Sequence, residues 1–304
     1  MPLEEKKLNS KIANFSVTEP KYCFDDIVLE RETFNDITSA VALFEKRDLI
    51  FNKWGFSSVL KLRKTVSINL YGESGTGKTM TAHAIANKLN KKLLIVNYAE
   101  IESKYVGETS KNIESLFTFA KNNDVVLFFD EADALLSKRV TLMQTASDVS
   151  VNQTRNVLLK LLDEYEGIVL FATNFLKNFD YAFLRRILFH IQFTLPNREQ
   201  RKKLWLHYLP DNFPLNERKE ELAEKLCEID NISGSDISNA ILRVAIMTTV
   251  KDKKEACYDE LKYELEKIRK TKKICEWGNC SVTTRKVTSE YVKEQMQGDF
   301  NGIF

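Results

Sequence analysis

The chain has 304 residues, of which 43% are hydrophobic and 29% charged, and its formal net charge is +2. This is enough for one large or two modest domains with a buried core, and the small net charge does not indicate a nucleic-acid-binding protein. The five scattered cysteines do not suggest a disulfide framework, and no apolar run approaches the roughly 20 residues of a membrane span, so we expect a cytoplasmic protein without a membrane partner.

The first 22 residues are largely polar and contain no signal-peptide core, and we expect a flexible leader over 1–22. A helical pattern over 34–51 is followed by short apolar runs that alternate with further helical patterns. The runs that predict strands are 66–71, 93–96, 125–129, 168–172 and 189–195. Buried strands that alternate with helices predict an α/β domain over 23–195, with a five-stranded parallel sheet and helices on both faces.

After Pro196 the apolar spacing is helical only. The segments with this spacing are 198–208, 222–229, 236–250 and 258–268. We therefore expect a small all-α domain with a C-terminal extension over 196–304.

The strongest motif is a phosphate-binding loop at residues 72–79, which fits G-x-x-x-x-G-K-[ST] in full. An apolar run ends before it and a helical pattern begins at Lys78, so a chance glycine-rich turn is the weaker reading. The glycines let backbone N–H groups face phosphate oxygens, Lys78 supplies charge to the β- and γ-phosphates, and Thr79 ligates Mg²⁺. The expected nucleotide-binding residues of this segment are Gly72, Glu73, Ser74, Gly75, Thr76, Gly77, Lys78, Thr79 and Met80.

Two carboxylates, Asp130 and Glu131, follow the apolar run 125–129. The carboxyl ends of strands in such a sheet are where ligands bind, so we expect Asp130 to hold Mg²⁺ and Glu131 to polarise the attacking water. The alternative, an exposed acidic helix start, is weak downstream of a phosphate-binding loop.

Two further polar signals are weaker. Asn174 ends the run 168–172 and is placed to hydrogen-bond the attacking water or the γ-phosphate, although Asn at a strand end is often a turn former. Arg185 and Arg186 are adjacent, and a catalytic role for them requires a neighbouring subunit.

A series of segments in this order resembles the AAA ATPases of the AAA+ superfamily, and within it the AAA clade proper. Besides the phosphate-binding loop, the segments are FDDIV (24–28), SKYVGE (103–108), FDEAD (129–133), ATN (172–174), LRRI (184–187), LPNR (195–198) and SGSDI (233–237). The resemblance covers about residues 23–250. It implies a P-loop AAA+ module followed by a helical lid domain, with ATP and Mg²⁺ as cofactors.

The resemblance also implies roles for single residues. Asn174 resembles the sensor-1 residue, and Arg185 and Arg186 resemble arginine fingers that reach the ATP of the adjacent protomer in a homohexameric ring. The residues placed to contact adenosine are Asp26, Ile27, Gly234 and Ser235. The residues that resemble a pore loop gripping an unfolded polypeptide are Lys104, Tyr105 and Val106.

The chain departs from the family where Glu73 and Ser74 replace two prolines, which puts a negative charge beside the phosphates. About two dozen residues precede Phe24, so we expect substrate choice to use the leader, the ring surface or an adaptor.

The residues are compatible with three functions. The first is a motor that pulls a protein partner through the pore, favoured by Tyr105 unless that ring belongs to the core. The second is a DNA-associated AAA+ motor or clamp-loader-like switch, for which the available basic residues are Lys104, Lys111, Lys138 and Arg139. The third, a nucleotide-binding scaffold without turnover, is disfavoured by intact Glu131 and Arg185.

For the motor, the compact module is similar to bacterial remodellers of HORMA-domain proteins. These are relatives of the pachytene-checkpoint ATPases and act in antiphage signalling. Against this resemblance, the chain has Ser235 near the position where eukaryotic members carry Arg.

Overall fold

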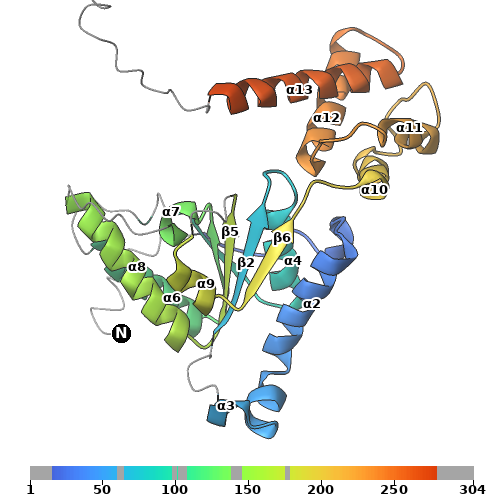
Figure 1. The fold of residues 1–304 in the computed structure, drawn as a ribbon. Coiled ribbons are helices and arrows are strands. Elements are labelled where there is room, and N and C mark those ends of the chain that lie inside the picture. Colours follow the sequence, from blue (N-terminus) through green and yellow to red (C-terminus); the bar gives the residue numbers. More distant parts are fainter. Residues whose placement is uncertain are drawn as a thin grey trace, which may run out of the picture.

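The sheet has six strands in the order β1-β3-β4-β5-β2-β6 in a computed structural model that describes residues 16–59, 65–97, 101, 108–137, 146–174 and 179–278 (Figure 1). The strands are β1 (Ser16–Thr18), β2 (Val66–Gly72), β3 (Leu93–Asn97), β4 (Val126–Asp130), β5 (Ile168–Thr173) and β6 (Phe189–Phe193). Strands β2 to β6 pair in parallel, which confirms the five strands and the α/β class predicted from the sequence.

The strand that the sequence did not predict is β1, which pairs antiparallel with β3 inside the segment expected to be a leader. It has three residues at the sheet edge, and Ser16 and Thr18 flank a half-exposed Val17. A strand this short makes edge contacts without the apolar run that marks a buried strand, so the hydrophobic pattern does not reveal it.

Helices cover both faces of the sheet because successive strand residues point to opposite sides. In β4, Val126 and Phe128 pack in one core cluster, and Leu127 and Phe129 pack in the other. The first face is covered by α2 (Arg31–Glu45) and α4 (Lys78–Lys88). The second face is covered by α6 (Glu108–Asn122), α7 (Asp133–Leu136), α8 (Ala146–Glu164) and α9 (Tyr181–Arg186) (Figure 1).

Short helices precede and follow α2, and the helical pattern expected over 34–51 is present, with one turn residue at 46 before the helical residues 47–53. The short helices are η1 (Phe24–Asp26), η2 (Leu49–Lys53) and α3 (Phe56–Val59). After α3 the next described strand is β2, which lies between β5 and the edge strand β6.

The helical part lies beyond the carboxyl end of the sheet (Figure 1). It contains α10 (Arg198–Tyr208), α11 (Lys219–Leu226), α12 (Gly234–Val250) and α13 (Tyr258–Gly278). Its separate core surrounds the fully buried Trp205, and Asn197 and Gln200 form a capping box at the start of α10. The helix α13 continues past the predicted end at residue 268. In the described part of the chain, no helix is long and apolar enough to cross a membrane.

Candidate active site

The phosphate-binding loop connects the end of β2 to the start of α4, as the motif predicts. Two of its glycines are required by close approach as well as by positive φ angles. A Cβ on Gly72, at φ 140°, would lie 1.9 Å from the carbonyl oxygen of Phe193 in β6. A Cβ on Gly75, at φ 76°, would lie 2.0 Å from Ser235 Oγ of the lid. These glycines therefore let the loop pack against both the sheet and the helical part.

The ammonium group of Lys78 lies at the carboxyl end of the sheet. The residue is 8% exposed, and its Nζ donates to the carbonyl oxygens of Gly72 and Glu73 at 2.7 and 2.8 Å. It also donates to Asn174 Oδ1 at 3.0 Å, which joins the phosphate-binding loop to the end of β5. The structure thus brings together two residues that are 96 positions apart in the sequence.

A hydroxyl and a carboxylate meet beside this lysine. Thr79 Oγ1 donates to Asp130 Oδ2 at 3.2 Å, and Asp130 Oδ1 accepts from the backbone N–H of Glu131 at 3.0 Å. Oxygen ligands of this kind suit Mg²⁺, which keeps several waters and takes one or two protein ligands. Thr79 and Asp130 therefore fit the magnesium role expected from the sequence.

Glu131 is the first residue beyond β4, and its side chain is exposed. Its φ angle of 50° is uncommon for a residue other than glycine, asparagine or aspartate. This backbone turn ends the strand and makes Glu131 part of the cavity lining, on the same edge as Lys78.

Asp133 was not singled out as a site residue, although it ends the quoted segment FDEAD. One of its carboxylate oxygens accepts from the backbone N–H of Asn174 at 3.4 Å. Burial lowers the pKa of Lys78, and the charges of Asp130 and Asp133 oppose this shift. Asp133 therefore acts on both the lysine and the asparagine, and its position three residues after Asp130 was the available sequence signal.

A cavity of about 700 Å³ lies between the phosphate-binding loop, the segment before α2, and the lid helices. This volume is within the range of small-ligand sites. The expected site residues that line it are Asp26, Ile27, Ser74, Gly75, Thr76, Gly77, Lys78, Thr79, Met80, Asp130, Glu131, Asn174, Gly234 and Ser235. Gly72 and Glu73 are not in this lining and contribute through the carbonyl groups that receive Lys78.

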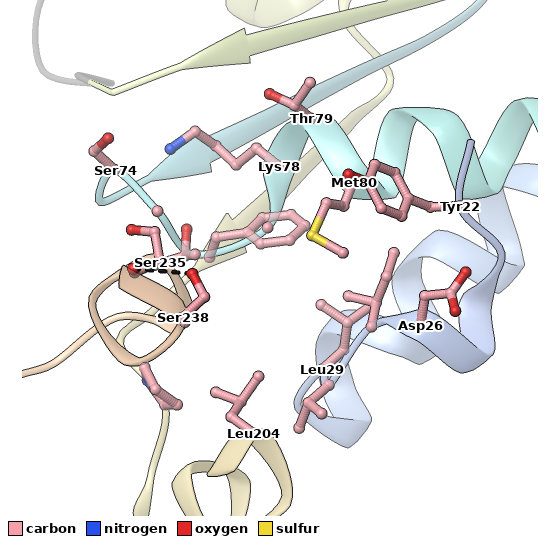
Figure 2. A pocket seen from close by; sticks show the side chains of 18 of the residues that line it. Tyr22, Asp26, Leu29, Ser74, Lys78, Thr79, Met80, Leu204, Ser235 and Ser238 are labelled. Carbon is pink, nitrogen blue, oxygen red and sulfur yellow. Dashed lines mark hydrogen bonds between the residues drawn. The ribbon is translucent and has the colours of Figure 1, made fainter. Parts of the chain in front are cut away.

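Further lining residues carried no motif signal. Figure 2 shows Leu29 and Leu204 on the part of the pocket away from Lys78, with Tyr22 near Met80. His207 of α10 also contributes to the wall. These apolar and aromatic side chains form a wall suited to a flat ring, whereas the opposite end is suited to phosphate.

Asp26 contributes to the cavity wall, while its carboxylate is held by a local contact. Asp26 Oδ2 accepts from the backbone N–H of Cys23 at 2.7 Å and from Cys23 Sγ at 3.2 Å. These hydrogen bonds lower the pKa of Asp26. The carboxylate thereby fixes the shape of the short helix η1, and the neighbouring Ile27 lies beside Gly77, 3.8 Å from where a Cβ would be.

The two candidate arginines lie on α9, and neither is among the described residues that line the cavity. Arg186 Nε pairs with Asp163 Oδ2 at 2.9 Å, and Arg186 also donates to the carbonyl oxygen of Ala182. Arg185 is exposed. The candidate pore residues Lys104, Tyr105 and Val106 lie outside the described residues, so their role stays a prediction.

Comparison with known proteins gives a family match over residues 68–195, to the ATPase family associated with various cellular activities (AAA). The chain is 32% identical over 247 residues to cell division protein C of Sulfolobus acidocaldarius, covering 77% of this chain and 61% of that protein. It is 30% identical over 261 residues to proteasome-activating nucleotidase 1 of Haloferax volcanii, covering 82% and 61%.

A third relative, 26S proteasome subunit RPT4 of Saccharomyces cerevisiae, is 26% identical over 281 residues. That match covers 90% of this chain and 62% of the yeast protein. The chain thus spans about three fifths of the length of these relatives.

Proposed function

We propose that this chain, whose residues 68–195 match the AAA family of ATPases, binds Mg-ATP, hydrolyses it, and uses the energy to remodel a protein partner. The observation that carries the proposal is the meeting of three groups at the carboxyl end of the sheet. Lys78 and Asn174 are joined at 3.0 Å, Thr79 and Asp130 at 3.2 Å, and Glu131 follows directly.

Each group has a separate task in phosphoryl transfer to water. Lys78 would attract the β- and γ-phosphates, and Thr79 and Asp130 would hold a magnesium ion, whose charge would offset that of the phosphate oxygens. Glu131 accepts a hydrogen bond from the attacking water, and Asn174 orients that water or the γ-phosphate. The apolar wall at Leu29 and Leu204 receives the base.

The separation of binding from hydrolysis is the test. Lys78→Ala is expected to lose binding of a fluorescent ATP analogue, and Glu131→Gln is expected to retain binding and lose phosphate release. Glu114→Gln, which makes the same change on an exposed position of α6, is the matched control and is expected to match the wild type. Equal loss of binding in Lys78→Ala and Glu131→Gln would contradict the division of roles.

We also propose a homohexameric ring in which Arg185 and Arg186 act on the ATP of the adjacent protomer. Two observations support it: neither arginine lines the cavity of its own chain, and Arg185 is exposed on α9. In the free chain Arg186 is paired with Asp163, so its finger role requires exchange of this partner at the subunit interface.

The partner in this proposal is a protein drawn past Lys104, Tyr105 and Val106 in the pore. The resemblance stated above points to a HORMA-domain protein in antiphage signalling, in the bacterial cytoplasm. The names of the relatives point instead to proteasome activation and to cell division.

Glu131→Gln rings trapped with ATP separate these partners, because the trapped ring retains its substrate. Mass spectrometry of the co-purified proteins identifies the class, with Lys78→Ala as the control that cannot form the trap. Retention of single-stranded DNA in place of a protein would favour the DNA-associated alternative and contradict the remodeller.

A further inference from the structure

Residues 230–236, which we call the lid loop, comprise the chain just before α12 and the first residues of that helix, and they touch the phosphate-binding loop directly. The backbone N–H of Ser235 donates to the carbonyl oxygen of Gly75 at 3.3 Å. The hydroxyls of Ser233 and Ser235, 3.0 Å apart, lie beside Gly75 where a Cβ would otherwise be. The position of this lid loop therefore helps to set the shape of the loop that receives phosphate.

The lid loop is held by a buried carboxylate. Asp236 is 3% exposed, and its Oδ2 accepts from the backbone N–H and the hydroxyl of Ser233, both at 2.8 Å. A carboxylate buried to this degree needs a cation or several donors to offset the loss of water. Through these two hydrogen bonds, Asp236 fixes the position of Ser233.

The cation that pairs with Asp236 is on α13, 36 positions later in the sequence. Lys272 of α13 donates from Nζ to the same Oδ2 of Asp236 at 2.6 Å. One turn earlier on α13, Arg269 pairs with Asp230 at 3.6 Å, at the other end of the lid loop. These two basic residues, three positions apart, share a helix face and hold both ends of the loop.

We propose that Lys272, assisted by Arg269, is a positioning residue for nucleotide binding: it holds the lid loop 230–236 against the phosphate-binding loop through Asp236. Lys272 is not among the described residues that line the cavity, so it acts through Asp236 and not on the nucleotide itself. The inference rests on the nucleotide site of the proposed function. It also gives the part of α13 beyond the predicted helix end a role in that site.

The effect of removing Lys272 falls on binding and not on the chemical step. Without it, the buried Asp236 loses its counter-ion, the lid loop relaxes, and Ser235 no longer fixes the carbonyl of Gly75. Lys78, Glu131 and the magnesium ligands keep their own partners. We therefore expect a higher KM with kcat nearly unchanged.

The experiment compares Lys272→Ala with Lys272→Arg and with Lys270→Ala, an exposed control on the same helix. Steady-state ATP hydrolysis and titration with a fluorescent ATP analogue are measured on the full chain. A charge-assisted hydrogen bond is stronger than a neutral one, but solvent screens it because Lys272 is half exposed, so Lys272→Ala should raise KM and Kd about tenfold. Lys272→Arg should restore most of the loss, and Lys270→Ala should match the wild type.

Thermal unfolding without nucleotide is measured in parallel, to detect a merely structural effect. If Lys272→Ala does not fold, Arg269→Ala serves as the second variant, and its longer ion pair predicts about a threefold rise in Kd. The double variant Lys272→Ala with Asp236→Asn should bind the ATP analogue as tightly as Asp236→Asn alone, since both changes remove the same contact.

The proposal is overturned if Lys272→Ala equals Lys270→Ala, if Lys272→Arg restores nothing, or if kcat falls while KM does not change. If the wild-type chain binds no nucleotide, the proposed function itself fails. If the wild type binds and Lys272→Ala binds equally well, only the inference about α13 fails.

Discussion

Replacing Gly72 by alanine tests whether the strand and the phosphate-binding loop are locked by backbone contact. The new Cβ would lie 1.9 Å from the carbonyl oxygen of Phe193, whereas ordinary contact begins at 3.4 Å. The obstacle is backbone in β6, which pairs with β2, so rotating a side chain does not relieve it. The φ angle of 140° adds strain of about 1–3 kcal/mol.

Overpacking of this kind costs about 1–3 kcal/mol more, which gives a total of about 2–6 kcal/mol for Gly72→Ala. At about 2–4 °C per kcal/mol for a domain of this size, the melting temperature should fall by roughly 4–24 °C. Binding of the ATP analogue should weaken as well, because the displaced carbonyl of Gly72 is a partner of Lys78.

The matched control is Gly55→Ala. Gly55 also has a positive φ, 79°, but a Cβ there would meet nothing within 4 Å. Gly55→Ala should lower the free energy of unfolding only by the backbone strain, about 1–2 kcal/mol, and should leave nucleotide binding unchanged. Thermal and denaturant unfolding of both variants separate the steric cost from the strain. Equal destabilisation of the two would refute the reasoning.

Three further predictions concern the proposed motor function. Arg185→Ala should lose much of the ~10³–10⁵-fold increase in hydrolysis rate that arginine fingers supply. Mixing this variant with Glu131→Gln should restore some phosphate release, since mixed rings contain some sites in which both the glutamate and the arginine are intact. No recovery in rings shown to exchange subunits would count against trans catalysis. Glu73→Gln should tighten ATP binding a few-fold at low salt by removing a charge near the phosphates, and unchanged Kd values would show that this carboxylate does not sense them. Tyr105→Ala should keep ATP turnover and stop partner unfolding in paired assays on one preparation, and retained unfolding would exclude a gripping role.

The parallel strands were predictable because strands buried on both faces need continuous apolar runs. Residues 125–129 and 168–172 are such runs, and they became β4 and β5. The edge strand β1 was not predictable, since three residues that pair on one side need no such run. The helical pattern over 34–51 was also predictable, whereas the turn at residue 46 and the π-helical hydrogen bonding of η2 were not, since apolar spacing does not encode them.

The site was predictable where chemistry restricts the residue type. Few other residue types could perform the roles proposed for Lys78 and Asp130, so a pattern identifies them. The cavity wall at Leu29 and Leu204 is different, because many apolar residues satisfy it and no motif marks it. The pair of Lys272 with Asp236 joins residues 36 positions apart, and only the folded chain brings such partners together.

The three oxygen atoms that accept hydrogen bonds from Lys78 affect which anions from solution can bind at this lysine. Each proton of the ammonium already has an acceptor from the chain, so an arriving anion gains only the difference between its attraction and theirs. Chloride carries a single charge, so its interaction with Lys78 is little more favourable than that of the acceptors it would replace. A polyphosphate offers several oxygens, which would accept hydrogen bonds from the lysine and from the backbone amides at the same time, so its binding would be more favourable. At the proposed nucleotide site, the phosphate-binding loop would therefore discriminate between anions, because a bound anion has to replace the hydrogen-bond acceptors that Lys78 already has.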